Sequence, residues 1–382
     1  MIYCERTMSI TVKQDILRYV VRVLLGQNGE NRNRDGCTIP RMKIGNNEYK
    51  VEIWYYYNQQ IFGSLSADGA IIMKRTKYPI NPDFKKWANM NPPLNRALLP
   101  VIQRSMGLLF TMERSTADLT VERKIIPVGN GDTIRALWYF SKDIAQNAPC
   151  LVYYHGGGFV WPASPHHYSL AKEYAQKAIC KVLFVEYRLA PKYQFPVAPE
   201  DCYAAYSWAI AHAKELSIDL DRIAVAGDSA GGQLATVVCL MAKERGQVMP
   251  CGQMLIYPAA GNVETESLRK YTDTPMCNSR DMEKYEKFYR PDPSVGKNEY
   301  ASPIEAESLE GLPPAYVETA EFDCLRDGGI LYVERLRKSG VTAELHNTEG
   351  TMHGFDIVLD SPIVRGCVDR RVAFLRQVFE AR

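Results

Sequence analysis

The chain has 382 residues, a formal net charge of +2 and a hydrophobic fraction of 46%. This length is typical of one large domain with an addition or of two domains, and the composition is ordinary for a globular protein with a buried core. A net charge this close to zero provides no broad basic surface, so we expect no nucleic-acid partner.

Cysteine spacing indicates the compartment. The ten cysteines lie singly from Cys4 to Cys367, and none forms a Cys-x-x-Cys pair, so neither a zinc motif nor a redox motif is expected. Scattered cysteines in a long chain are typical of reduced thiols, and the N-terminal sequence does not have the pattern of a signal peptide. We therefore expect a cytoplasmic protein.

The first expected element is an amphipathic helix at 16–25. Arg18 and Arg22 lie on one face of it, and the stretch is too short to cross a bilayer, so we expect it to dock on its own protein rather than on a membrane. A loop is expected at 27–36, a turn at 45–47 and strands at 51–57 and 70–73.

We thus predict an N-terminal extension over residues 1–78, consisting of a helix and a short β-meander. We favour a role in packing or as a subunit interface of a homo-oligomer. A wall or lid of the active site is the alternative.

From residue 79 the pattern changes to alternating helices and strands. Residues 81–112 look helical, with breaks at Pro92-Pro93 and at Pro100. Strands are then expected at 121–128, 134–140, 150–154, 181–186, 222–226, 253–257, 315–319 and 342–346. Helices are expected at 167–178, 199–213, 230–244, 327–337 and 364–379. This order predicts an α/β domain over 79–382, with a mainly parallel eight-stranded sheet, helices on both faces and ligands at the carboxyl ends of the strands.

The strongest motif is Gly227–Gly232, with the sequence GDSAGG, between an apolar run at 223–226 and an expected helix. This is G-x-S-x-G in a strand–turn–helix setting, in which a sharp turn exposes the serine hydroxyl beside a helix N-terminus. Glycines two residues before and after the serine remove side chains that would collide. We predict that Ser229 is a nucleophile; a plain tight turn is the alternative.

A second motif, His155–Gly158 with the sequence HGGG, directly follows an expected strand. Its glycines expose consecutive amides that can point at one oxygen, and each donor to a tetrahedral oxyanion contributes about 3–4 kcal/mol. A phosphate-binding loop is the alternative, but the Lys-Ser/Thr of a P-loop does not follow. We assign the oxyanion hole to the amides of Gly157, Gly158 and Ala230, with Gly156 shaping the loop.

The base has to be one of six histidines. His353 lies in a loop after the last expected strand, where hydrolases with this nucleophile turn carry their base, whereas His155 is expected to orient the oxyanion loop. Asp323 follows the strand expected at 315–319 and is the predicted acid. Asp327, one helical turn further, is the second choice.

In this scheme His353 accepts the proton of Ser229, Asp323 stabilises the imidazolium, and water hydrolyses the acyl-enzyme. The chemistry needs no metal ion and no organic cofactor. The base works only when neutral, so activity is expected to fall in mildly acid buffer.

From about residue 81 to its end, the chain resembles the hormone-sensitive-lipase-like esterases (bacterial family IV) of the α/β-hydrolase superfamily. The resemblance implies that the HGGG loop builds the oxyanion hole and that the stretch beginning at Tyr187 supports that loop. Cys324 stands where the family often has a proline after the acid. The resemblance is carried by the HGGG loop, Tyr187–Pro191, Phe195-Pro196, Asp201, the Ser229 turn, the Asp323 segment and His353–Phe355.

The family's cap corresponds to residues 81–112 and roughly 262–289 of this chain. Aromatic residues expected to line the substrate pocket are Phe159, Trp161, Tyr285 and Phe288, although ordinary cap packing would also account for them.

The leading functional hypothesis is a carboxylesterase acting on small-molecule esters with short- or medium-chain acyl groups. A deacetylase of acetylated sugars or polysaccharide, or an amidase, would use the same triad. A non-catalytic ligand receptor on this fold is disfavoured, because Ser229, Asp323 and His353 are all present.

Overall fold

The computed structural model describes residues 41–44, 47–50, 64–65, 71–72, 77–92, 94–261 and 263–381. The chain divides into two compact units, Met1–Lys74 and Arg75–Arg382. In the first unit, β1 (Arg41–Ile44) pairs antiparallel with β2 (Asn47–Lys50), and β3 (Ser64–Leu65) pairs with β4 (Ile71–Ile72). The helix expected at 16–25, the loop at 27–36 and the strand at 51–57 lie outside the described residues.

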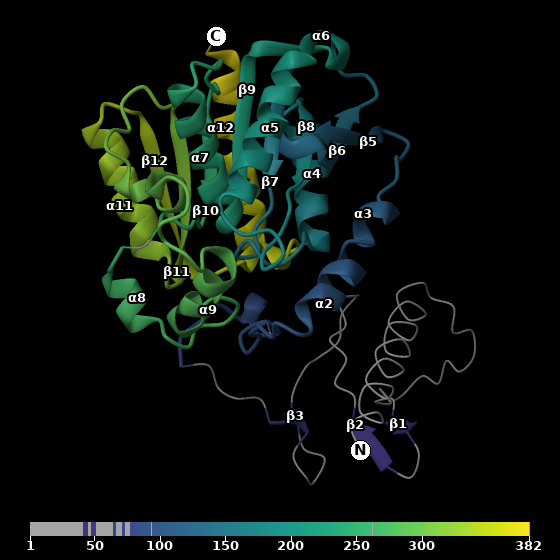
Figure 1. Ribbon diagram of the computed structural model, residues 1–382, viewed down its shortest axis with the longest axis vertical. Helices are drawn as coiled ribbons and strands as arrows, with labels where there is room; N and C mark the ends of the chain where they lie inside the picture. The colour runs from purple at the N-terminus through teal and green to yellow at the C-terminus, as the bar shows by residue number, and fades with distance from the viewer. Residues whose placement is uncertain are drawn as a thin grey trace. The chain divides into compact units, whose positions relative to one another are not determined.

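In the described part of the second unit, eight strands form one sheet in the order β12-β11-β10-β9-β7-β8-β6-β5 (Figure 1). β6 pairs antiparallel with β5 and β8, and the other neighbours are parallel. The mainly parallel sheet is therefore confirmed. The strands are β5 (Leu119–Pro127), β6 (Thr133–Ser141), β7 (Ala148–Tyr154), β8 (Lys181–Glu186), β9 (Ile218–Asp228), β10 (Gln253–Ile256), β11 (Ala315–Phe322) and β12 (Ala343–Met352).

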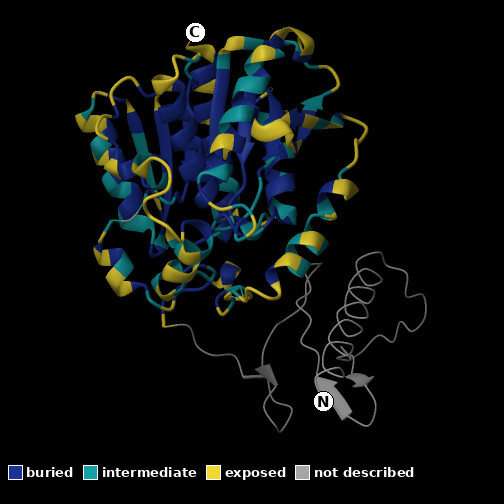
Figure 2. Cartoon of the chain, in the orientation of Figure 1, coloured by how far each residue is buried: buried dark blue, intermediate teal, exposed yellow. Residues whose placement is uncertain are grey.

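Helices cover both faces of this sheet, as expected. α5 (Val197–Ala211), α7 (Ala230–Glu244) and α11 (Arg326–Lys338) pack into one apolar cluster, and α4 (Pro165–Lys177) and α12 (Pro362–Glu380) into another. Successive residues of each central strand contribute alternately to the two clusters, so these strands are buried on both faces (Figure 2). This burial explains their nearly continuous apolar sequences.

Shorter elements complete the second unit. They are η1 (Pro82–Phe84), α2 (Leu99–Met106), α3 (Leu109–Met112), η2 (Gly129–Gly131), α6 (Ala213–Leu216), α8 (Glu266–Lys270), α9 (Ser279–Tyr289), α10 (Asn298–Ala301), η3 (Pro303–Glu305) and η4 (Phe355–Ile357). The expected break at Pro100 is wrong. This proline lies in the first turn of α2, where a missing N–H leaves no helical hydrogen bond unmade.

The two segments predicted as the cap contact each other and the sheet's loops. Met276 N donates to Met90 O at 2.6 Å, which joins the segment before α9 to the segment after η1. From α2, Gln103 Nε2 donates to Val160 O at 2.8 Å and to Ala190 O at 2.7 Å, so α2 is tied to the chain that follows the HGGG motif.

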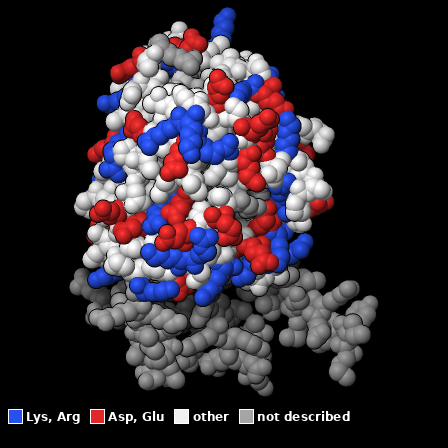
Figure 3. Space-filling model, turned by 90° about the vertical axis from the view of Figure 1, so that its left-hand side faces the viewer, with Lys and Arg blue, Asp and Glu red and all other residues white. Residues whose placement is uncertain are grey.

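The described residues show neither a broad charged surface on the face drawn in Figure 3 nor a helix that could span a membrane. On the face drawn in Figure 3, basic and acidic side chains are interspersed without a broad area of one sign. Among the described residues, none of the helices combines the length and apolarity required to span a bilayer.

Candidate active site

Ser229 lies at the junction of β9 and α7 with φ 54° and ψ −120°, a conformation that side chains rarely adopt. The turn is possible because its neighbours are glycines. A Cβ on Gly227 would come 2.3 Å from the backbone of Gly231, and one on Gly231 would come 2.0 Å from Tyr154 O. The predicted tight strand–turn–helix is therefore confirmed, and its steric demand explains the glycine spacing.

The three residues predicted from the motifs come together at the carboxyl ends of β9, β11 and β12. His353 Nε2 lies 2.7 Å from Ser229 Oγ, and His353 Nδ1 lies 2.7 Å from Asp323 Oδ2. Ser229 and His353 are each 8% exposed and Asp323 is fully buried. The result is a continuous hydrogen-bonded relay whose carboxylate end is its most deeply buried part.

His353 lies in the turn that directly follows β12, as expected, although β12 extends well beyond the strand expected at 342–346. β12 runs to Met352, because pairing with β11 resumes at Phe322 after a bulge. Gly350, with φ 68°, donates its N–H to Glu321 Oε2 at 2.7 Å across this irregularity. The sheet itself therefore positions the histidine.

The charges around His353 set its basicity. Burial alone would lower its pKa, but the negative charge of Asp323, the thiol of Cys277 and the hydrogen bond to Asp323 together raise the pKa to about 9. The pair therefore favours the imidazolium, the form that must be stabilised after proton transfer from a serine.

Asp327, the second choice for the acid, has a different role. Its Oδ2 accepts from Ser267 N at 2.7 Å and its Oδ1 accepts from Arg326 Nε at 2.8 Å. The first bond ties the start of α8 to the start of α11, the second lies within the first turn of α11, and neither involves His353.

The HGGG loop presents backbone donors beside this relay. Gly157 and Gly158 have φ values of 126° and 58°, which glycine adopts readily. Among the described residues, none accepts a hydrogen bond from the amides of Gly157, Gly158 or Ala230. Gly156 N, in contrast, donates to Asp228 Oδ1 at 3.0 Å, so this glycine shapes the loop as expected.

His155 and Tyr187 support the loop from beneath. Tyr187 Oη donates to His155 O at 2.8 Å, and the two rings stack with centroids 4.5 Å apart. His155 Nδ1 lies 2.7 Å from Gly156 O. Burial and the neighbouring His167 lower the pKa of His155 to about 4, so its ring is neutral near pH 7 and serves as a packed support.

Asp228 is a residue that reasoning from sequence missed. Its Oδ1 accepts from Gly156 N and from Tyr153 Oη, at 3.0 and 2.8 Å, and its Oδ2 lies 3.1 Å from His167 Nε2. Burial would raise the pKa of Asp228, but its electrostatic interaction and hydrogen bond with His167, together with the hydroxyl of Tyr153, hold it below its usual value. A buried carboxylate thus joins the nucleophile turn, β7, the oxyanion loop and α4.

The backbone fixes the tautomer of His167. Ser164 N donates to His167 Nδ1 at 2.9 Å, so Nδ1 is an acceptor and the neutral ring carries its proton on Nε2, facing Asp228. A serine that caps α4, followed by a proline, was the sequence signal for this arrangement, because it sets where the helix starts.

The predicted pocket residues lie in two environments. The Phe159 ring stacks on Tyr289 at 3.8 Å and belongs to the core, whereas Trp161 Nε1 donates to Tyr285 Oη at 3.1 Å. A Cβ on Gly158 would come 2.5 Å from the Tyr285 ring, so α9 covers the oxyanion loop with this tyrosine. Phe288 is half-buried against the same core cluster. A pocket-lining role for these four residues stays a prediction.

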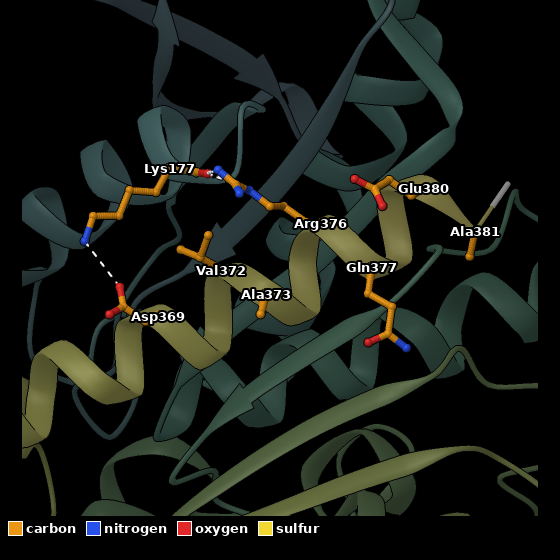
Figure 4. A pocket seen from close by; sticks show the side chains of 8 residues that line it. All are labelled: Lys177, Asp369, Val372, Ala373, Arg376, Gln377, Glu380 and Ala381. Carbon is orange, nitrogen blue, oxygen red and sulfur yellow. Dashed lines mark hydrogen bonds and ion pairs between the residues drawn. The ribbon is translucent and has the colours of Figure 1, made fainter.

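A separate hollow of about 730 Å³ lies along α12, and Figure 4 shows the side chains that line it. Three of its polar side chains are already engaged: Lys177 Nζ lies 3.6 Å from Asp369 Oδ1, and Arg376 Nη2 donates to Lys177 O at 2.5 Å. None of the predicted site residues lines it. Its lining residues are Lys177, Asp369, Val372, Ala373, Arg376, Gln377, Glu380 and Ala381.

Comparison with known proteins identifies the fold family of the chain. A family model for the alpha/beta hydrolase fold matches residues 151–357. Esterase LipI of Mycobacterium tuberculosis is 35% identical over 245 residues, which cover 64% of this chain and 75% of the relative. The chain belongs to this family. Its resemblance to the hormone-sensitive-lipase-like branch is confirmed, and this α/β-hydrolase is a carboxylesterase.

Two further similarities come from related hydrolases. The ethyl acetate hydrolase of Pseudomonas putida is 34% identical over 215 residues, which cover 56% of this hydrolase and 68% of the relative. The structure of a bacterial heroin esterase has a TM-score of 0.72 and 33% identity, covering 79% of this chain and 99% of the other.

Proposed function

We propose that this carboxylesterase hydrolyses short- to medium-chain acyl esters through an acyl-enzyme on Ser229, with His353 as base and Asp323 as acid. The observation that carries the proposal is the relay Ser229 Oγ–His353 Nε2–Asp323 Oδ2, with both contacts at 2.7 Å. Such distances allow direct proton transfer without movement of the base.

In the first half-reaction, His353 Nε2 accepts the hydroxyl proton while Ser229 Oγ attacks the ester carbonyl carbon. Asp323 Oδ1 accepts from Leu325 N at 2.9 Å, which holds the carboxylate so that Oδ2 faces His353 Nδ1. The imidazolium formed is stabilised by this carboxylate and then protonates the leaving alcohol.

The tetrahedral oxyanion would be bound by the amides of Gly157, Gly158 and Ala230. Ala230 N lies at the start of α7, so the positive end of the helix dipole adds to the donors. Each such donor stabilises the transition state by about 3–4 kcal/mol. Water activated by His353 then hydrolyses the acyl-enzyme, which needs no metal ion or organic cofactor.

A small acyl group is supported by the cap and by the relatives. Tyr285 lies over Gly158, which limits the room beside the oxyanion loop. The names of two similar proteins refer to ethyl acetate and to heroin as substrates. We therefore expect small esters to be turned over faster than long-chain ones.

The test is a chain-length series of p-nitrophenyl esters, from acetate to palmitate, with the wild type and Ser229→Ala. We expect maximal kcat/KM at acetate to hexanoate, and loss of activity in the variant with an unchanged circular dichroism spectrum. Retained turnover by Ser229→Ala would remove Ser229 as nucleophile. Faster turnover of acetylated sugars or anilides than of aryl esters would replace the carboxylesterase proposal by deacetylase or amidase specificity.

A further inference from the structure

Two buried thiols meet beside the proposed acid. Cys277, in the segment between α8 and α9, and Cys324, directly after Asp323, have Sγ atoms 3.7 Å apart. Cys277 is 8% exposed and Cys324 is fully buried. The two thiols and a carboxylate oxygen of Asp323 lie within 4.8 Å of one another. Among the described residues, these three atoms form a donor set that could hold a metal ion.

The sulfur separation is that of a tetrahedral thiolate site. With Zn–S bonds of about 2.3 Å, two sulfurs of a tetrahedron lie about 3.8 Å apart, whereas a disulfide bond is about 2.05 Å long. The observed 3.7 Å therefore suits a shared cation without further approach of the sulfurs. Met282 Sδ lies 3.8 Å from Cys277 Sγ, and a third sulfur so close favours a soft cation.

Hydrogen bonds fix the backbone on both sides of this pair. Ser267 Oγ donates to Cys324 O at 2.9 Å, and Thr274 Oγ1 donates to Cys277 O at 2.7 Å. Asp323 Oδ1 is held by Leu325 N. The donors are thus preorganised by the segments that carry them, so binding would require little rearrangement.

We propose that Cys277, Cys324 and Asp323 form an inhibitory site for a soft divalent cation of the Zn²⁺ or Cd²⁺ class. Three protein donors leave the fourth tetrahedral position to water. Binding forms two metal–sulfur bonds and one metal–oxygen bond, and the thiol protons are released to solvent.

The first deprotonation is assisted by the neighbouring groups. The hydrogen bond from Cys324, followed by the positive charge on His353, lowers the pKa of the Cys277 thiol. The same hydrogen bond and burial raise the pKa of Cys324.

Inhibition follows from the position of Asp323. A carboxylate engaged with a cation is a weaker acceptor for His353 Nδ1 and stabilises the imidazolium less. This second step rests on the proposed function, because it requires Asp323 to act as the acid. The cation-binding step depends only on the three donors, so the two steps are measured separately.

The test uses the full-length enzyme, reduced with a phosphine and freed of metals with a chelator, and CdCl₂ as the probe. We expect one equivalent of Cd²⁺ to produce a sulfur-to-metal charge-transfer absorption in the ultraviolet. Hydrolysis of p-nitrophenyl butyrate should fall at least tenfold in parallel and recover with EDTA. With one equivalent of Cd²⁺, Cys277→Ala and Cys324→Ala should each lack the absorption, and Cd²⁺ should not inhibit either variant.

Cys180→Ala is the matched control, since this buried thiol lies at the amino end of β8, opposite the relay, and should behave like the wild type. Absence of the absorption in the wild type, or its persistence in both cysteine variants, would overturn the site. Absorption without inhibition would overturn the inhibitory role. If Asp323→Asn retained full activity without metal, the proposed function would fail while the absorption of the wild type would still report the site.

Discussion

The two sides of Ser229 are held in different ways. On the oxyanion side, the buried carboxylate of Asp228 accepts hydrogen bonds from Gly156 N, Tyr153 Oη and His167 Nε2, all from elements packed on the sheet. On the acid side, Asp323 lies at the boundary between the sheet and the segment that contains Cys277.

The oxyanion side of the site is therefore fixed, whereas the acid side contains thiols that can still react or bind a ligand. The oxyanion donors depend on groups saturated by hydrogen bonds within the core, so their positions change only if the core changes. The acid has two thiols as neighbours, and their protonation and ligands can change without unfolding. The contrast leads to predictions that differ in size on the two sides.

The largest effect is expected at Asp323. In Asp323→Asn the introduced amide can donate to His353 Nδ1, which leaves the proton on Nε2 and prevents it from accepting from Ser229. We expect kcat to fall about 10⁴-fold. Asp327→Asn is the matched control and should change kcat by less than about threefold, because Asp327 bonds to Ser267 and Arg326. Equal losses in the two variants would contradict the assignment.

The next effect is expected on the oxyanion side, in Gly158→Ala. The new Cβ would come 2.5 Å from the Tyr285 ring at a φ of 58°, so the loop must shift and its donors with it. We expect kcat to fall about 10²- to 10³-fold with a smaller change in KM. Gly129→Ala, where a Cβ meets no atom within 4 Å, should leave both parameters unchanged. A kcat near wild type for Gly158→Ala would show that this amide does not contribute.

A moderate effect is expected in Asp228→Asn. The introduced NH₂ would face the proton on His167 Nε2, so one hydrogen bond is lost and the oxyanion loop is held less firmly. We expect the free energy of unfolding to fall by about 2 kcal/mol and kcat to fall about tenfold, measured by urea denaturation and steady-state kinetics. Asp369→Asn, at an exposed ion pair, serves as control. Lower stability with unchanged kcat would make Asp228 purely structural.

The smallest effect is a shift in pH dependence. The base acts when neutral, and the pKa of His353 is raised to about 9, so kcat/KM should rise with pH through the range 7–9 rather than level off above 6.5. Cys277 is among the groups that raise this pKa, so Cys277→Ala should move the rise to lower pH and Cys180→Ala should not. A plateau from pH 7 upward in the wild type would contradict the raised pKa.

The predictable parts of the molecule were those set by local constraints. The central strands of the main sheet carry apolar runs because they are buried on both faces. The glycines at 227 and 231 are dictated by backbone atoms of the same turn and of the neighbouring strand β7. For the same reason Ser229, the HGGG loop, Asp323 and His353 could be selected from motifs and chain order.

The missed features depend on contacts between distant segments. His167 and Asp228 are 61 residues apart, and Cys277 and Cys324 are 47 apart, so neither pair forms a motif. The extension of β12 to Met352 depends on renewed pairing with β11 beyond a bulge, which residue periodicity does not encode. Pro100 fits inside α2 because it lies in the first turn, and residue periodicity does not give the residue at which a helix starts.

The central claim is that the hydroxyl of residue 229, served by His353, forms the covalent intermediate. Intact-mass spectrometry after reaction with a fluorophosphonate tests it directly. We predict a single adduct on the wild type, mapped by peptide sequencing to Ser229, none on Ser229→Ala, and labelling slowed by several orders of magnitude in His353→Ala. An adduct on Ser229→Ala of the same mass and rate as on the wild type would contradict the account.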